Sequence, residues 1–175
     1  MDDKLSARQV IDALGLEPNQ TCGFVTPTYS SALVAEGLPA PFEASRPAGS
    51  ALYFLVTPQA PVQLHRIQND QLYHYYLGDP LEVVMLLPDG TVELATVGPH
   101  ILEGDRLQLL IPGGTFHTAR TTGEGSWFLG GSTEWPGVIP ADVELGDAAE
   151  LGERYPSALR EIHTFPMPVE PKPTA

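Results

Sequence analysis

The stretch "HRIQNDQLYHYYLGDPLEV", residues 65–83, contains apolar and aromatic runs separated by the turn sequences "NDQ" and "GDP". Short runs of this composition, bounded by Asn, Asp, Gly and Pro, are typical of antiparallel strands joined by tight turns. The stretch also holds two of the five histidines and three of the six tyrosines of the chain. It therefore predicts a β-fold that carries side chains able to bind a metal or transfer protons.

The same alternation of strands and turns continues on both sides. Asp89-Gly90 between two apolar runs predicts a hairpin, and "EGD", "PGG" and "TGEG" separate further runs. Many short strands at near-regular spacing predict a sandwich or barrel, and a jelly roll fits their number. The predicted strands span residues 51–57, 61–67, 71–77, 81–87, 91–97, 107–111, 115–119 and 126–133.

Helices are predicted at the two ends of this β-region. Ser6 and Gln9 form a capping box before an apolar helical face, and Gly15 is placed to end that helix. Asp147 begins a second short helix, which Pro156 is expected to stop. Length and pattern predict one domain over residues 1–165 and a proline-rich, disordered tail over residues 166–175.

Composition narrows the classes of function. The chain is 42% hydrophobic and 18% charged, which is typical of a globular protein, and its net charge is −13. Such a charge disfavours binding to nucleic acid or to an anionic membrane. Cys22 is the only cysteine, so no intramolecular disulfide can form, and we expect it to be inert. With neither a signal-peptide pattern nor a long apolar run, a cytoplasmic protein is expected.

Two motifs resemble those of the cupin superfamily. The first cupin motif runs H-x-H, three or four residues, E, six residues and G, and the second contains P-x-G-x-x-H. The matching residues are His65, Ile67, Gln71 and Gly78 in the first, and Pro112, Gly114 and His117 in the second.

The chain also resembles, over residues 6 to about 160, a small cupin family whose members mostly lack an assigned function. The shared pattern includes R-x-x-x-S-x-x-Y-[FY]-L, H-R-x-x-x-D-E-x-W-H-x-x-x-G-D-P-L and E-L-G-D-x-x-E-L. Its counterparts here begin at Arg46, His65 and Glu144. The resemblance implies an all-β cupin barrel (a double-stranded β-helix, or jelly roll) with an N-terminal helix and a short C-terminal helix, usually in a dimer. Gln71 and Tyr73 replace the family's acidic residue and tryptophan, so the pocket differs while the barrel is kept.

A metal is a common feature that the resemblance implies, held by two histidines and a glutamate of the first motif and a histidine of the second. Here Ile67 and Gln71 stand at two of those places. Two imidazoles and a neutral amide are a poor ligand set for iron, manganese or zinc. We expect no built-in metal; the alternative is a weakly bound divalent metal at His65, Gln71 and His117.

Acid–base chemistry is the second possibility. Side chains alternate along strands, and the resemblance implies that His65, Gln71, Tyr73 and Tyr75 point into the barrel while His74 points outward. A histidine beside tyrosines can accept and donate protons near neutral pH, as in metal-free sugar-nucleotide epimerases of the superfamily. The candidates are His65, Tyr75 and His117 as catalytic residues, and Gln71, Tyr73, Tyr53 and Glu134 as substrate-binding residues.

Three hypotheses follow for function. The first is a metal-independent enzyme (isomerase, epimerase, dehydratase or cyclase) that acts on a partly apolar small molecule, for example in a tailoring step of natural-product biosynthesis. The second is a non-catalytic ligand-binding cupin, and the third a metallo-cupin using His65 and His117. His74, and at least one tyrosine, also fit a purely structural role.

One further segment bears on assembly. "TPTYSSALVAEGL", residues 26–38, is mildly apolar and too long for a simple connection. We expect it to lie along the barrel as an arm or edge strand, and the family resemblance favours a homodimer with two equivalent pockets. A surface excursion within one subunit is the alternative.

Overall fold

The computed structural model describes residues 5–42, 44–121, 123 and 125–168. Its first element is the predicted helix, α1 (Ala7–Leu14). Ser6 Oγ accepts from Gln9 N at 3.3 Å, and Gln9 Oε1 accepts from Ser6 N at 2.8 Å, so the capping box is confirmed. Val10 of α1 packs against the outer face of the barrel.

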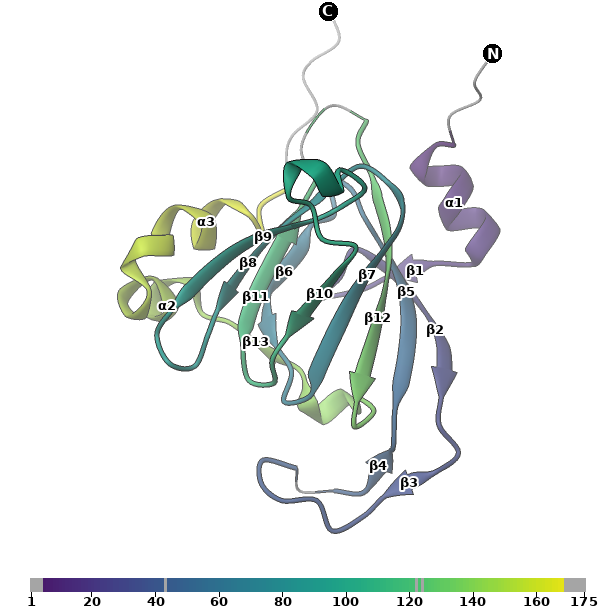
Figure 1. Ribbon diagram of the computed structural model, residues 1–175, viewed down its shortest axis with the longest axis vertical. Helices are drawn as coiled ribbons and strands as arrows, with labels where there is room; N and C mark the ends of the chain where they lie inside the picture. The colour runs from purple at the N-terminus through teal and green to yellow at the C-terminus, as the bar shows by residue number, and fades with distance from the viewer. Residues whose placement is uncertain (1–4, 43, 122, 124, 169–175) are drawn as a thin grey trace, which may run out of the picture.

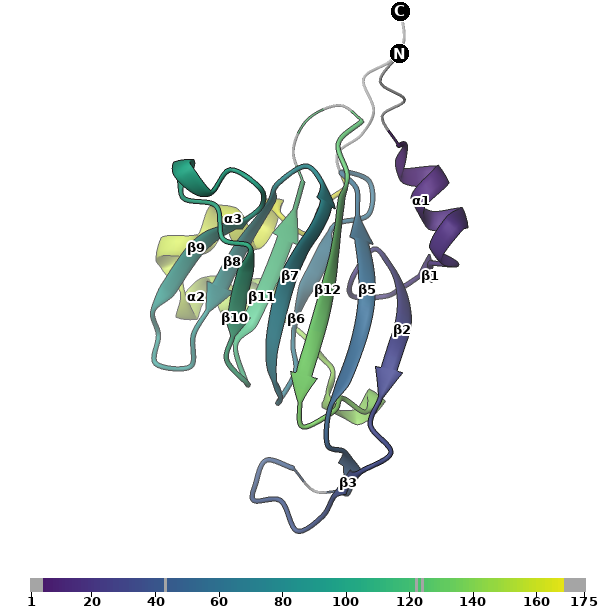
Figure 2. The same ribbon diagram turned by 45° about the vertical axis from the view of Figure 1, so that its right-hand side comes forward.

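Two antiparallel sheets form the barrel (Figures 1 and 2). The six-stranded sheet has the order β1 (Glu17–Pro18), β2 (Phe24–Ser30), β5 (Ser50–Val56), β12 (Phe128–Trp135), β7 (Asp70–Gly78) and β10 (Gln108–Ile111). The five-stranded sheet has the order β13 (Glu144–Leu145), β6 (Val62–Arg66), β11 (Phe116–Arg120), β8 (Leu81–Leu86) and β9 (Val92–Val97). All eight predicted strands are confirmed, with ends that differ by at most two residues.

The core between the sheets comes from alternate residues of facing strands. Phe54, Tyr73, Met85, Leu109 and Phe128 are all nearly inaccessible to solvent. This filled region occupies one end of the barrel, and a hollow remains toward the other end. The period-two pattern therefore decides which side chains face inward.

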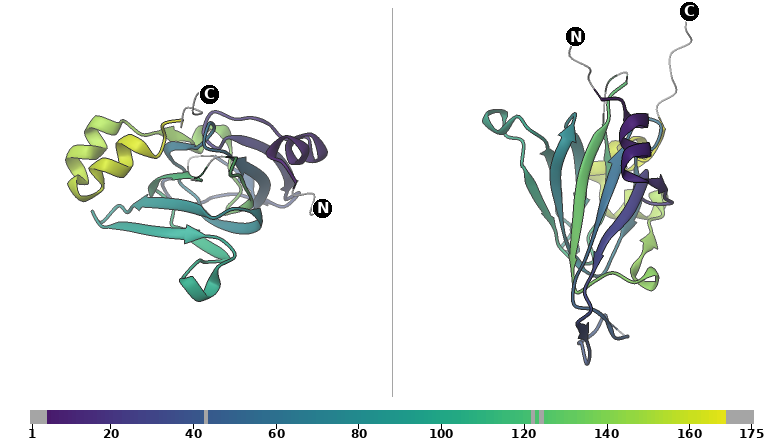
Figure 3. Two further views of the ribbon diagram at one scale, coloured as in Figure 1. Left: turned by 90° about the horizontal axis from the view of Figure 1, so that it is seen from above. Right: turned by 90° about the vertical axis from the view of Figure 1, so that its right-hand side faces the viewer.

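Two helices, not one, close the C-terminal part (Figure 3). The predicted helix is α2 (Ala148–Arg154), capped by Asp147. After the short 3₁₀ turn η3 (Pro156–Ala158), the chain forms α3 (Leu159–Thr164), which we did not predict. Pro156 ends one helix but also occupies the first position of the next turn, where its missing N–H costs nothing. Buried Ile162 and Phe165 hold this part on the five-stranded sheet, opposite α1.

The segment 26–38 lies within its own subunit. Its first part belongs to β2, which pairs with β5 of the same chain through a register shift between Pro27 and Tyr29. The chain then forms a small projection, in which β3 (Val34–Ala35) pairs with β4 (Arg46–Pro47). The predicted strand along the barrel is therefore present, without an exchange between subunits being needed to form it.

The remaining short elements are the 3₁₀ turns η1 (Ile101–Glu103) and η2 (Pro140–Asp142). Of the predicted tail, residues 169–175 lie outside the described residues. At its start, Pro166 O accepts a hydrogen bond from Gln63 Nε2 at 3.0 Å. Among the described residues, no helix combines the length and apolar character that crossing a membrane requires.

Candidate active site

A cavity of about 420 Å³ lies inside the barrel between the two sheets. Its walls are largely apolar, with Leu52 and Phe54 on one sheet and Ile67 following β6 of the other. A volume in this range suits a small organic ligand. Its polar lining includes Cys22, Ser50, His65, Gln71, Tyr73, Ser132 and Glu134. We call it the barrel cavity.

His65 is buried in the wall of this cavity and has a defined tautomer. Its Nδ1 lies 2.8 Å from Gln63 O, and because a carbonyl oxygen only accepts, Nδ1 carries the proton. Nε2 is then the basic atom. Burial lowers the pKa of His65, although the bond to Gln63 opposes this effect. The imidazole is therefore neutral at pH 7.

His117 lies beside His65 as its cross-strand partner on β11, with ring centroids 4.3 Å apart. Its Nδ1 faces Thr115 O at 3.4 Å, and its Nε2 lies 2.9 Å from the hydroxyl of Tyr73. Tyr73 therefore donates to His117. Burial, and then the nearby His65, lower the pKa of His117 well below its usual value. His117 supports the cavity from behind, and Tyr73 separates its Nε2 from a ligand.

Cys22 reaches the same cluster. Burial raises the pKa of its thiol to about 11, and the neighbouring Thr21 and Tyr73 side chains oppose this shift. A thiol with this pKa stays protonated at neutral pH and is a weak nucleophile. The prediction that Cys22 is chemically inert agrees with this environment.

Glu134 is a buried acid on the opposite sheet from His65. One carboxyl oxygen accepts from Ser132 Oγ at 2.5 Å and the other from Ser50 Oγ at 2.6 Å. Burial raises the pKa of Glu134, and the two serine hydroxyls oppose the shift. Its register partner on β7 is Gln71, so the amide and the carboxyl lie side by side on the cavity wall.

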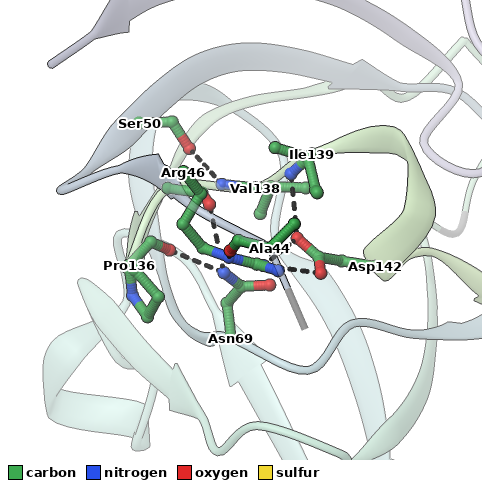
Figure 4. Close-up of polar contacts among 9 residues, drawn as sticks. Ala44, Arg46, Ser50, Asn69, Pro136, Val138, Ile139 and Asp142 are labelled. Carbon is green, nitrogen blue, oxygen red and sulfur yellow. Dashed lines mark hydrogen bonds and ion pairs between the residues drawn. The ribbon is translucent and has the colours of Figure 1, made fainter. Parts of the chain in front are cut away.

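A loop over residues 136–143 forms another wall of the cavity, and a buried ion pair holds it (Figure 4). Arg46 Nη1 lies 2.6 Å from both carboxyl oxygens of Asp142, which also accepts from Ile139 N at 2.8 Å. Asn69 Nδ2 donates to Pro136 O at 2.6 Å. Ser50 Oγ accepts from Val138 N at 3.1 Å while it donates to Glu134. One serine thus joins the loop to the acid.

The contacts of the loop give a structural role to a part of the family pattern whose role was open from the sequence. Arg46 and Ser50 are the R-x-x-x-S pair of the family pattern, and they fix the loop and Glu134. Ser132, which binds the other oxygen of Glu134, lies two residues before it on β12 and faces the same side. Sequence reasoning named Glu134 but not Arg46, Ser50 or Ser132. The contacts of Arg46 and Ser50 join distant parts of the chain. Strand alternation could have pointed to Ser132, which lies two residues from Glu134.

Comparison with known proteins now identifies the family. The family profile described as "Cupin superfamily (DUF985)" matches residues 8–146. The chain belongs to this cupin family. A hypothetical protein from Leishmania major has a similar structure, with a TM-score of 0.85 and 26% identity over 93% of this chain and 99% of the other. A Shewanella oneidensis protein gives a TM-score of 0.80 and 25% identity over 95% and 100%. None of the curated proteins matches the chain.

The residues of this cupin at the expected metal position do not fit a divalent ion. Ile67 offers no donor atom, and Nε2 of His117 already accepts from Tyr73. Within the described part of the chain, no three His, Cys, Asp or Glu side chains come together so as to hold a metal ion. Metal independence stays a prediction.

Two predicted site residues of the cupin lie away from the cavity. Tyr75 shares the inward face of β7, but it stands about 13 Å along the strand from Gln71, at ~3.3 Å per residue. Its hydroxyl donates to Gly78 O at 2.8 Å, and its ring packs near Phe128. Tyr53 points outward, where its ring meets that of Tyr76 at 5.7 Å. Alternation gives the face of a strand but not the depth within the barrel.

His74 lies on the outer face of the same sheet, where its contacts indicate a structural role. Its Nε2 contacts Thr133 Oγ1 at 2.9 Å, and its Nδ1 contacts Gln108 Nε2 at 3.0 Å. Tyr76 stacks beside it and lies across Gly131, where a side chain would clash. The outward position predicted for His74 agrees with these contacts.

Other hollows of the cupin lie outside the barrel. Hollows of about 590 and 480 Å³ lie on its surface, near Gly146 and near Asp105 respectively. An apolar groove of about 340 Å³ runs between α1 and Tyr53. None of the three is lined by His65, Gln71, Tyr73 or Glu134.

Proposed function

We propose that the barrel cavity binds a small, partly apolar molecule and transfers protons on it, with His65 as the base and Glu134 as the acid. The observation that carries this proposal is the placement of two buried titratable groups on opposite sheets of one cavity. Burial lowers the pKa of His65 from 6.5 and raises that of Glu134 from 4.5. The two shifts bring the proton affinities of the imidazole and the carboxylate closer together, which favours passage of a proton from one group to the other through the ligand.

The proton balance of such a step is simple. A C–H bond next to a substrate carbonyl breaks, its proton moves to Nε2 of His65, and its electrons form the C=C bond of an enol. Glu134 rests as the ionised form that accepts from the two serines, and its protonated form, which burial makes more accessible, gives its proton to the substrate oxygen. When His65 returns its proton to another carbon and the enol hydroxyl gives its proton back to Glu134, the C=O bond re-forms, the isomerisation is complete and both residues regain their starting states. If the oxygen protonated is instead a β-hydroxyl, it leaves as water, and the step is a dehydration.

The other polar residues have supporting roles in this proposal. Tyr73 holds His117 by a hydrogen bond, and the ring of His117 positions that of His65. Gln71 offers an amide donor and a carbonyl acceptor to the ligand. Tyr75 and Tyr53 have no part, because neither lines the cavity. Glu134, predicted from sequence as a binding residue, takes the role of acid.

Deuterium incorporation tests the proposal. A panel of 1,3-diketones and β-hydroxyketones is incubated with the protein in D₂O and followed by proton NMR. The expected result is exchange or water loss with at least one compound, reduced about a hundredfold or more in His65→Asn, which is the usual size of a general-base contribution. His74→Asn, on the outer face, is the matched control and should keep the rate. Exchange that survives in His65→Asn would remove His65 from the mechanism.

A further inference from the structure

We propose that the barrel cavity selects uncharged or cationic ligands that carry hydroxyl or amino groups, and that it rejects carboxylates and phosphates. The inference rests on the proposed function in taking this cavity as the substrate site. It adds the chemical class of the substrate.

The first argument is charge. Among the described residues that line the cavity there is no lysine or arginine, and Glu134 is its acid. The neighbouring Arg46 is buried and bound to both oxygens of Asp142, so its charge is already compensated. An anionic ligand would meet a carboxyl and a neutral imidazole, and a buried charge without a partner is costly. The net charge of −13 also disfavours the approach of anions.

The second argument is the use of backbone donors. Backbone N–H groups can bind an anion without any basic side chain. An anion could therefore still bind if the N–H groups at the cavity wall were free. In the loop over residues 136–143, Val138 N donates to Ser50 Oγ and Ile139 N to Asp142 Oδ2. In the segment before β2, which also lines the cavity, Thr21 N and Cys22 N donate to Asn19 Oδ1 at 2.9 and 3.1 Å. These four groups are therefore already occupied.

The third argument is that several hydroxyl groups of the cavity wall, like the backbone N–H groups, donate to protein atoms and not to the cavity. Ser50 and Ser132 donate to Glu134, and Tyr73 donates to His117. Thr21 Oγ1 donates to Asn19 Oδ1 at 2.9 Å. The hydrogens of these four hydroxyls point into the protein, whereas His65 Nε2 and the remaining lone pairs of Glu134 are acceptors. Gln71 keeps its donors, and so do Asn19 and the exposed Tyr29 and Ser30, so the acceptors dominate in the buried part of the wall around His65 and Glu134.

The ligand must complement this arrangement. Hydroxyl or ammonium groups would donate to His65 and Glu134, while an apolar body of less than about 420 Å³ would contact Leu52, Phe54 and Ile67. Phenols, polyols with an apolar end and amines meet these conditions. A sugar nucleotide does not, because its diphosphate would find no cation in the cavity.

Binding of matched triads tests this inference. Each triad keeps one carbon skeleton and ends in ammonium, hydroxyl or carboxylate; tyramine, tyrosol and para-hydroxyphenylacetate form one example. Affinities of a set of aromatic and aliphatic triads are measured at pH 7 by ligand-observed NMR and calorimetry. Carboxylates are expected to bind at least tenfold more weakly than their alcohols. Glu134→Gln should weaken the ammonium members at least tenfold and narrow the gap to the carboxylates. Glu153→Gln, on the exposed side of α2, removes the same charge and should leave the order unchanged.

Carboxylates that bind as tightly as their alcohols would overturn the inference, and so would a set in which no member binds. The two proposals fail separately. If the order holds but no bound ligand shows exchange that depends on His65, the protein is a ligand-binding cupin and the catalytic proposal fails. If carboxylates bind best and still undergo exchange that depends on His65, the catalysis stands and the inference fails.

Discussion

At the scale of single residues, the neighbouring rings of His65 and His117 determine what the cavity can do. Both histidines use Nδ1–H toward a carbonyl two residues back in their own strand region, which leaves Nε2 as acceptor in each. Tyr73 occupies that atom in His117. The Tyr73 hydroxyl therefore distinguishes the two histidines: it occupies Nε2 of His117, whereas Nε2 of His65 remains available as a base for the ligand.

The first prediction concerns acid stability. In the unfolded chain a histidine gains its proton near pH 6.5, whereas burial, and then His65, keep His117 neutral to a much lower pH in the folded state. The unfolded state then binds more protons, so stability falls as the pH drops below 6.5, by up to about 1.4 kcal/mol per pH unit for one such group. His117→Gln should make the melting temperature less dependent on pH in this range. An unchanged slope would contradict the neutral state assigned to His117.

At the scale of elements, the loop over residues 136–143 depends on the ion pair between Arg46 and Asp142. Removing one partner of a buried pair leaves an uncompensated charge, which costs about 3–5 kcal/mol. Arg46→Met should therefore lower the free energy of unfolding by this amount and speed amide hydrogen exchange in the loop. Replacing both residues, as Arg46→Met with Asp142→Leu, should recover part of the loss.

The exposed pair Arg8 and Asp12 on α1 is the matched control. Exposed pairs contribute about 0–1 kcal/mol, because water screens them. Arg8→Met should therefore change stability little. Equal effects of Arg8→Met and Arg46→Met would show that the buried pair does not hold the loop.

Most elements could be predicted from local sequence because strand alternation, turn residues and helix caps are local. Helix α3 could not, since Pro156 indicates both the end of one helix and the start of the next turn. A strand was expected within residues 26–38, but its start at Phe24 and its pairing with β5 could not be predicted, because they depend on contacts between separate parts of the chain. In the site, the first motif and the family pattern around it indicated His65, Gln71 and Tyr73, and Glu134 was a further candidate outside both motifs; all four line the cavity. The loop and its ion pair could not be found, because Arg46 and Asp142 lie 96 residues apart.

At the scale of the whole molecule, we propose a homodimer. The projection formed by β3 and β4 exposes apolar side chains away from the barrel, with Leu33 71% and Val34 52% exposed. Light scattering should give about twice the chain mass of 18.8 kDa. Leu33→Asp should shift the protein toward monomer, whereas Leu102→Asp, in the 98% exposed position on η1, should not. A monomer that persists on concentration would contradict the proposal.

The central claim is that His65 and Glu134, and not a bound metal, move protons in the barrel cavity. Its most direct test is the rate of deuterium incorporation after exhaustive treatment with a chelator, measured for the wild type, His65→Asn and Glu134→Gln, with elemental analysis of each sample. The account predicts that chelation leaves the wild-type rate unchanged and that each substitution lowers it. A rate that disappears with the chelator and returns with added divalent metal would contradict it.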